Sequence, residues 1–208
     1  DIRTMEDLRG RKVSFGPAGN SAALTGPVVF QRLGIPIEQM LLDHSMGLDR
    51  LRKGEISAVV RVVGKPVDYF SKIPANSGLH FLAIPGKKVF DDIYALAELT
   101  NADYPTLVAP GDTIDTISMP TVLAVFNWAP KSERYARVQR FVERMFERWD
   151  KLQVDPFHPK WREINLAAEV PGWKRSGVAQ QMLAKLTQTD AAGEKNFRAF
   201  LNERPSGG

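Results

Sequence analysis

Short apolar segments alternate with helical segments along the first part of the chain, and glycine or proline separates them. The run 11–15 is rich in β-branched and aromatic residues and ends at Gly16. Asn20 or Ser21 can then cap a helix that extends to about residue 33. Strands that alternate with helices of this length predict an α/β fold with a parallel or mixed sheet flanked by helices.

The same alternation predicts further elements along this part of the chain. Strands are expected at 39–42, 56–63 and 79–84, and helices at 47–53 and 67–73. Two extended runs are expected later, at 113–118 and 122–126.

The C-terminal part is predicted to be mainly helical. Ser132 can cap a long helix, because the apolar residues after it recur with the 3.6-residue period of one helix face. These residues are Tyr135, Val138, Phe141, Val142, Met145, Phe146 and Trp149. A loop rich in proline and aromatic residues follows. The last expected elements are a helix near 179–186 and an amphipathic piece that contains Phe197, Phe200 and Leu201.

The composition excludes several classes of protein. The chain has 208 residues, of which 43% are hydrophobic and 25% charged, and this is typical of a globular protein of one or two domains. No segment approaches the roughly 18 apolar residues that a membrane span needs. Cysteine is absent, which excludes disulfides and cysteine-ligated metals. The net charge of +4 is small and the basic residues alternate with acidic ones, so we expect no nucleic-acid partner.

The stretch 14–21 is the first candidate for a binding site. A strand runs into small residues and then into a helix start, which leaves backbone N–H groups free to bind an anion. Gly16 and Gly19 let a ligand approach the backbone, and the helix dipole attracts negative charge. We expect Gly16, Gly19, Asn20 and Ser21 to contact a ligand. The alternative is an ordinary strand-to-helix turn, and the spacing fits neither a P-loop nor a dinucleotide fingerprint.

The second candidate lies at the carboxyl end of the predicted strand 56–63. Arg61 interrupts an otherwise apolar strand, and Gly64 and Lys65 follow it closely. Open α/β sheets bind their ligands at this end of the strands. We therefore expect Arg61, Gly64 and Lys65 to take part in ligand binding, with a solvated basic loop as the alternative.

Nothing in the sequence indicates catalysis, a cofactor or a metal. The three histidines, His44, His80 and His158, lack metal-binding spacing, and we expect them to be ordinary structural residues. No nucleophile elbow or recognisable triad is present. The sequence therefore predicts a protein that is not an enzyme and needs no cofactor.

Several segments, taken in order, resemble the TAXI family of TRAP-transporter solute receptors. They are 7–16, 19–21, 33–35, 51–58, 63–66, 103–105, 114–119, 157–161 and 170–173. The resemblance covers most of the chain. It departs from the family at the helix start, where Gly19, Asn20 and Ser21 stand in place of the usual Gly-Ser-Gly-Thr.

The resemblance implies a periplasmic binding protein of the type II fold, in which two lobes close over a small solute. It implies that residues 1–112 form the second lobe, and that 113–208, with crossover strands and C-terminal helices, complete or brace the first lobe. The segment that begins a full receptor is expected to be missing. A lobe uncovered in this way is expected to self-associate.

The function implied by the resemblance is periplasmic capture of a small anionic solute, such as an amino acid or a dicarboxylate, for a membrane transporter subunit. The turn from Gly16 to Ser21 would hold the anionic group, and Arg61 or Lys65 would add a compensating charge.

Two other functions are compatible with the same fold. One is a cytoplasmic ligand-sensing effector domain of the LysR type, although the Pro/Trp-rich C-terminal loops do not resemble it. The other is an enzyme built on this fold, for which the sequence offers no acid, base or nucleophile constellation.

Overall fold

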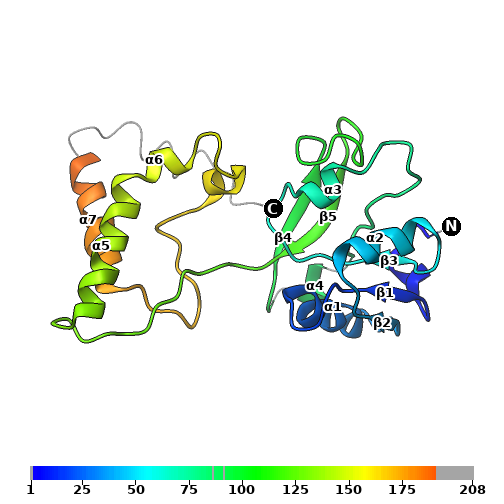
Figure 1. The fold of residues 1–208 in the computed structure, drawn as a ribbon, viewed down its shortest axis with the longest axis horizontal. Coiled ribbons are helices and arrows are strands. Elements are labelled where there is room, and N and C mark those ends of the chain that lie inside the picture. The colour runs from blue at the N-terminus through cyan, green and yellow to red at the C-terminus, as the bar shows by residue number, and fades with distance from the viewer. Residues whose placement is uncertain (1, 86, 91, 191–208) are drawn as a thin grey trace. The chain divides into compact units, whose positions relative to one another are not determined.

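The computed structural model describes residues 2–85, 87–90 and 92–190. Contacts divide the chain into two compact units, which we call unit 1 (Asp1–Met119) and unit 2 (Pro120–Gly208). Among the described residues, the strands lie in unit 1, whereas the regular elements of unit 2 are helices (Figure 1). In the part of the chain described, no helix combines the length and the apolar character that crossing a membrane requires.

Unit 1 is built on a three-stranded parallel sheet with the order β2-β1-β3. Its strands are β1 (Lys12–Ser14), β2 (Glu38–Met40) and β3 (Ala58–Val59). Val13 of the central strand lies opposite Gln39 on one side and Ala58 on the other. The predicted α/β fold with a parallel sheet and flanking helices is therefore confirmed.

Strand β3 is shorter than the predicted run 56–63, because its partner β1 ends early. The backbone pairing extends only from Ser57 N–H, which donates to Lys12 O, to Val60 N–H, which donates to Ser14 O. Directly after this, the chain of β1 turns at Gly16, whose φ is +77°. The next residues of the apolar run then have no strand to pair with.

Helices α1 (Ser21–Arg32) and α2 (His44–Arg52) cover opposite faces of this sheet, as the alternation of side chains along β1 requires. Phe15 points to α1, where its ring meets that of Phe30 edge-to-face at 5.9 Å. Ser14 points the other way, so that its Oγ lies 3.1 Å from the position of a Cβ on Gly47 of α2. Glycine at this position lets α2 approach the strand closely.

The main core of unit 1 lies on the α1 side of the sheet. Buried residues of the short 3₁₀ helix η1 (Met5–Leu8), of β1 and of α1 pack together there. They are Met5, Leu8, Val13, Phe15, Phe30 and Ile35. This cluster fixes the direction in which α1 leaves the turn at the carboxyl end of β1.

A separate antiparallel pair completes unit 1. It consists of β4 (Ala95–Thr100) and β5 (Thr113–Ser118), with Leu96 opposite Ile117 (Figure 1). The predicted strand 79–84 is wrong as a regular strand. Its one ladder-like bond is from Ile84 N–H to Asp115 O, beside β5. Two short helices, α3 (Asp68–Ser71) and α4 (Lys87–Phe90), come between β3 and β4 in the sequence.

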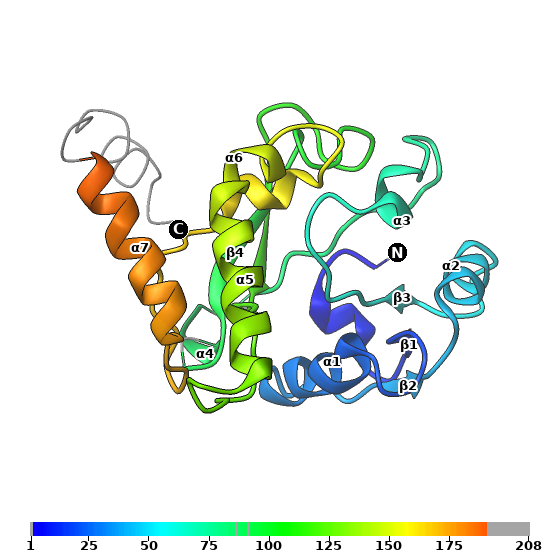
Figure 2. The same ribbon diagram turned by 60° about the vertical axis from the view of Figure 1, so that its left-hand side comes forward.

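Unit 2 contains the helices α5 (Glu133–Glu147), α6 (Trp149–Leu152), η2 (Pro159–Glu163) and α7 (Gly177–Asp190). The predicted cap is confirmed, because Ser132 Oγ accepts from Tyr135 N–H at 3.1 Å. Helices α5 and α7 lie side by side in both views (Figures 1 and 2). Their shared core contains Val142, Phe146, Val178 and Leu183.

Two other expectations concern this half of the chain. The extended run 122–126 forms no strand, since it pairs with no neighbouring strand in the described structure. The amphipathic piece with Phe197, Phe200 and Leu201 lies outside the described residues. The contacts divide the chain after Met119, because 113–118 is strand β5, which pairs with β4. The lobe division at 112 that the resemblance implies stays a prediction.

Candidate functional site

The strand order β2-β1-β3 creates a position at which loops diverge. After β1 the chain passes to β2 on one side, and after β2 it returns to β3 on the other side. Sheets of this kind bind ligands at the carboxyl ends of the strands where the order reverses. The loops that follow β1 and β3 meet this position, and both carry predicted site residues.

The turn after β1 has the geometry predicted for the start of a helix. Asn20 is the N-cap of α1, and its Oδ1 accepts from Ala23 N–H at 2.7 Å. Gly16 and Gly19 have φ of +77° and +81°, a region that residues with a Cβ rarely adopt. Ser21 is the first residue of the helix and its side chain is exposed.

The side chains of Asn20 and His44 meet over Gly16. A Cβ on Gly16 would lie 2.2 Å from Asn20 Nδ2 and 2.4 Å from His44 Cε1. Asn20 Nδ2 is buried and has no hydrogen-bond partner within the described structure. An unpaired buried donor is costly, so this amide favours the arrival of an acceptor.

His44 is the first residue of α2 and was not expected at the site. Burial lowers the pKa of His44, the positive charge of Arg61 lowers it further, and Asp43 opposes both effects. The imidazole is therefore neutral at pH 7. Its sequence context contains no metal motif. The one feature of the sequence that points to a site role for His44 is its place at the start of the helix that follows β2, which is the carboxyl end of the sheet.

Arg61 reaches the same group of side chains through Tyr69 of α3. Its guanidinium carbon lies 4.8 Å from the centroid of the Tyr69 ring. The Tyr69 hydroxyl donates to the carbonyl of His44 at 3.0 Å, and the two rings lie 6.0 Å apart. Burial raises the pKa of the Tyr69 phenol, while the nearby arginine charge opposes this, so the phenol remains protonated and able to donate.

The other two predicted residues of this loop do not join that group in the structure. The Lys65 ammonium donates instead to the carbonyl of Glu98 at 2.6 Å and to Asp103 Oδ2 at 2.9 Å. Gly64 is exposed beside it in the loop. Lys65 is thus engaged with Glu98 of β4 and with the turn that follows β4, whereas the positive charge of Arg61 acts on His44.

The site as a whole offers donors and positive charge. We call the residues Gly16, Asn20, His44, Arg61 and Tyr69 the β1/β3 cluster. Within the described ranges, no group of three or more His, Cys, Asp or Glu side chains could hold a metal ion. The cluster is suited to bind a group that only accepts hydrogen bonds, such as a carboxylate.

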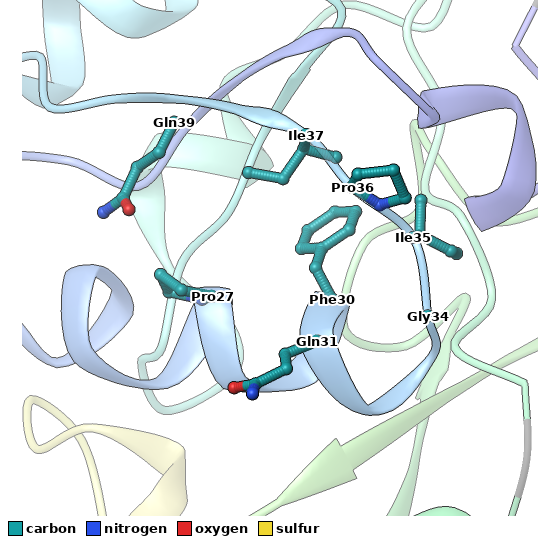
Figure 3. A pocket seen from close by; sticks show the side chains of 8 residues that line it. All are labelled: Pro27, Phe30, Gln31, Gly34, Ile35, Pro36, Ile37 and Gln39. Carbon is teal, nitrogen blue, oxygen red and sulfur yellow. The ribbon is translucent and has the colours of Figure 1, made fainter.

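A different pocket, of about 450 Å³, lies at the opposite end of the sheet (Figure 3). The second half of α1 forms one wall, and the segment that enters β2 forms the other. The lining residues are Pro27, Phe30, Gln31, Gly34, Ile35, Pro36, Ile37 and Gln39. Its lining carries no ionisable side chain, and it includes none of the residues predicted from the sequence.

One comparison with known proteins bears on this chain. The model of the NMT1-like family matches residues 1–172. The matched part contains all of unit 1, and with it the whole β1/β3 cluster, and continues into unit 2 as far as Gly172.

Proposed function

The chain belongs to the NMT1-like family, a family of periplasmic solute-binding proteins with a periplasmic-binding-type fold, and we propose that it captures a small anionic solute for a TRAP-type transporter of the TAXI kind. Solute binding follows from the family. The anionic solute and the type of transporter are the parts that we propose.

The observation that carries the anionic solute is the buried amide donor of Asn20 over Gly16, together with the cation Arg61 in the loop after β3. Asn20 Nδ2 is buried without a hydrogen-bond partner among the described residues, and the guanidinium of Arg61 lies over the ring of Tyr69, whose hydroxyl donates to the carbonyl of His44. A carboxylate accepts from both kinds of donor, and charge-assisted hydrogen bonds are the stronger ones. The N-terminus of α1 adds the favourable end of its dipole. Amino acids and dicarboxylates are the solutes that fit this set.

The TAXI assignment is supported by the order of the resembling segments along the chain. They begin with 7–16, which contains β1, and include 63–66 and 103–105, which contact each other through Lys65 and Asp103. We further propose that a membrane transporter subunit receives the solute. As the TAXI resemblance implies no catalytic step, we expect the solute to be released unaltered.

The proposal is tested by measuring the binding of L-glutamate and succinate by calorimetry, with L-glutamine as the ligand that lacks the second carboxylate. Arg61→Gln is expected to weaken glutamate binding at least about tenfold, because a charged hydrogen bond is lost. Asn20→Asp keeps an acceptor for the helix cap but replaces the free donor by a carboxylate, so it is expected to weaken binding similarly.

Arg11→Gln is the matched control. Arg11 directly precedes β1, at the amino end of the sheet, and its substitution removes the same charge far from the cluster. We expect it to leave the affinity unchanged. Binding that tolerates both Arg61→Gln and Asn20→Asp would contradict the assignment of the site.

A further inference from the structure

The turn that follows β4 holds the loop after β3 through two neighbouring residues. Asp103 accepts from the Lys65 ammonium at 2.9 Å. Next to it, the Tyr104 hydroxyl accepts from Val67 N–H at 3.2 Å. The loop that begins after β3 is thus tied at two successive points to a turn about forty residues away in the sequence.

The Asp103 contact is largely shielded from water. The side chains of Lys65 and Asp103 are 26% and 14% exposed, whereas most ion pairs of this chain are far more exposed. Asp103 Oδ2 also accepts from the backbone N–H and the hydroxyl of Thr100, both at 2.9 Å. Burial on its own raises the pKa of Asp103, but the hydrogen bonds from Lys65 and Thr100 lower it by more. The carboxylate is therefore charged and fixed in place.

The Tyr104 contact is anchored by packing. Tyr104 is only 2% exposed, and its ring meets the rings of Phe70 and Phe81 at centroid distances of 6.0 and 5.1 Å. Phe70 in turn packs against Tyr69, the residue under the Arg61 guanidinium. The turn therefore supports both the loop that carries Arg61 and the aromatic ring over which Arg61 lies.

We propose that Asp103 and Tyr104 are positioning residues for the β1/β3 cluster, and that they act by holding the loop that carries Arg61. The inference rests on the proposed function, in which Arg61 pairs with the anionic group of the solute. It also gives Lys65 a role that differs from the one expected from the sequence. In this proposal Lys65 ties the loop to Asp103 through its ammonium group and does not itself bind the ligand.

The test uses the full chain and two substitutions that each remove a single contact. Asp103→Asn keeps an acceptor for Thr100 but loses the charge that faces Lys65. Tyr104→Phe removes only the oxygen that accepts from Val67. Hydrogen exchange is expected to become about fivefold faster or more at the amide of residue 67 and in the loop 60–65, with no change in α1 or α5. Glutamate affinity is expected to fall roughly tenfold in the variant that combines Asp103→Asn and Tyr104→Phe.

A double-mutant cycle separates positioning from a general loss of stability. In the Arg61→Gln background, Asp103→Asn is expected to cause no further loss of affinity, because the anchor acts through Arg61. The control is Asp68→Asn, which breaks the exposed ion pair between Asp68 of α3 and Lys72, the residue that follows the helix, and is expected to change neither exchange nor affinity.

The outcomes for the anchor and for the proposed function are distinguishable. Unchanged hydrogen exchange in the loop for both Asp103→Asn and Tyr104→Phe overturns the proposed anchor. So does a loss of affinity that Asp103→Asn causes equally in the wild-type and in the Arg61→Gln background. A wild-type chain that binds neither glutamate nor succinate contradicts the proposed function. In that case the hydrogen-exchange rates in the loop 60–67 of the wild type, Asp103→Asn and Tyr104→Phe still test whether Asp103 and Tyr104 hold this loop.

Discussion

Gly16 is the residue on which the geometry of the candidate site depends most. Its positive φ turns the chain at the end of β1, and its missing side chain leaves room for those of Asn20 and His44. Both requirements must be met at once for the donor of Asn20 to lie above the turn. The positive φ is shared with other turn glycines, but among the described glycines of positive φ only Gly16 has side chains in the space that a Cβ would need.

Gly16→Ala is expected to destabilise the protein by about 3 kcal/mol or more, since the backbone strain at positive φ costs roughly 1–2 kcal/mol and the clash adds to it. Gly19→Ala is the matched control. Gly19 has a similar φ of +81°, but a Cβ there meets nothing within 4 Å, so only the strain applies. Urea unfolding of both variants measures the difference, and equal losses would show that the clash with Asn20 and His44 is unimportant.

His44 gives the stability a specific pH dependence. Because the folded state lowers the pKa of His44 below its ordinary value of 6.5, the unfolded chain binds a proton more readily. The contribution of His44 to stability is therefore complete above about pH 6.5 and decreases as the pH falls below it. Unfolding free energies from pH 5 to 8 are expected to fall less steeply towards acid in His44→Gln than in the wild type. His80→Gln removes an exposed imidazole and is the control. If the unfolding free energy of His44→Gln depends on pH as steeply as that of the wild type, His44 is not the source of the pH dependence.

The sequence predicts one part of the site and not the other, for a physical reason. The cap at Asn20 depends on neighbouring residues alone, so it is visible as a polar residue before a run of small helical ones. The role of His44 depends on its approach to Gly16, about thirty residues away, which only the packing of α2 on the sheet brings about. Lys65 illustrates the same limit, because its partner Asp103 lies in a different element.

At the scale of elements, α1 is fitted to β1 through a glycine in the helix interior. A Cβ on Gly26 would lie 2.2 and 2.3 Å from two ring atoms of Phe15. Phe15 is fully buried, so its ring has no free space into which to move. Close contact between helix and strand therefore requires glycine at this position.

Gly26→Ala is expected to destabilise the protein by about 1–3 kcal/mol, because overpacking against Phe15 outweighs the gain in helix propensity. In an exposed helix the same change stabilises by about 1 kcal/mol. The double variant Gly26→Ala with Phe15→Leu provides the check, since a smaller side chain at 15 is expected to reduce the cost of the alanine. Urea unfolding measures Gly26→Ala, Phe15→Leu and the double variant, and a stabilising Gly26→Ala would show that the ring can move aside.

The elements that the sequence predicts best are those with strong local signals. Helix α5 has a cap and a regular apolar face, and β1 with α1 has a clear turn between them. By contrast, β4 reads Ala-Leu-Ala-Glu-Leu-Thr, a composition that favours helix, and it is a strand because β5 pairs with it. The run 79–84 has the composition of a strand but joins β5 through one bond only. Pairing partners decide such segments, and they are not visible locally.

At the scale of the whole molecule, the β1/β3 cluster and its anchor all belong to unit 1. This unit contains its own parallel sheet and a second apolar cluster formed by Val29, Phe90 and Tyr94, against which Ile117 of β5 packs. Strand β5 is thus part of the core of unit 1. The division into lobes at residue 112, which the resemblance implies, stays a prediction. It concerns which part of the solute site each lobe of a receptor provides.

The contacts of β5 predict how the chain can be divided experimentally. A fragment of residues 1–119 is expected to unfold cooperatively in urea. It keeps both apolar clusters, the three strands of the parallel sheet and the antiparallel pair of β4 and β5. A fragment of residues 1–112 lacks β5 and leaves β4 without a partner and the second cluster without Ile117. It is expected to lose on the order of 3 kcal/mol or more, a large share of the 5–15 kcal/mol that stabilises a typical domain. Circular dichroism and urea unfolding compare the two fragments. Equal stability would mean that the antiparallel pair contributes little to unit 1, and that the division after 112 describes the folding unit better than the one after Met119.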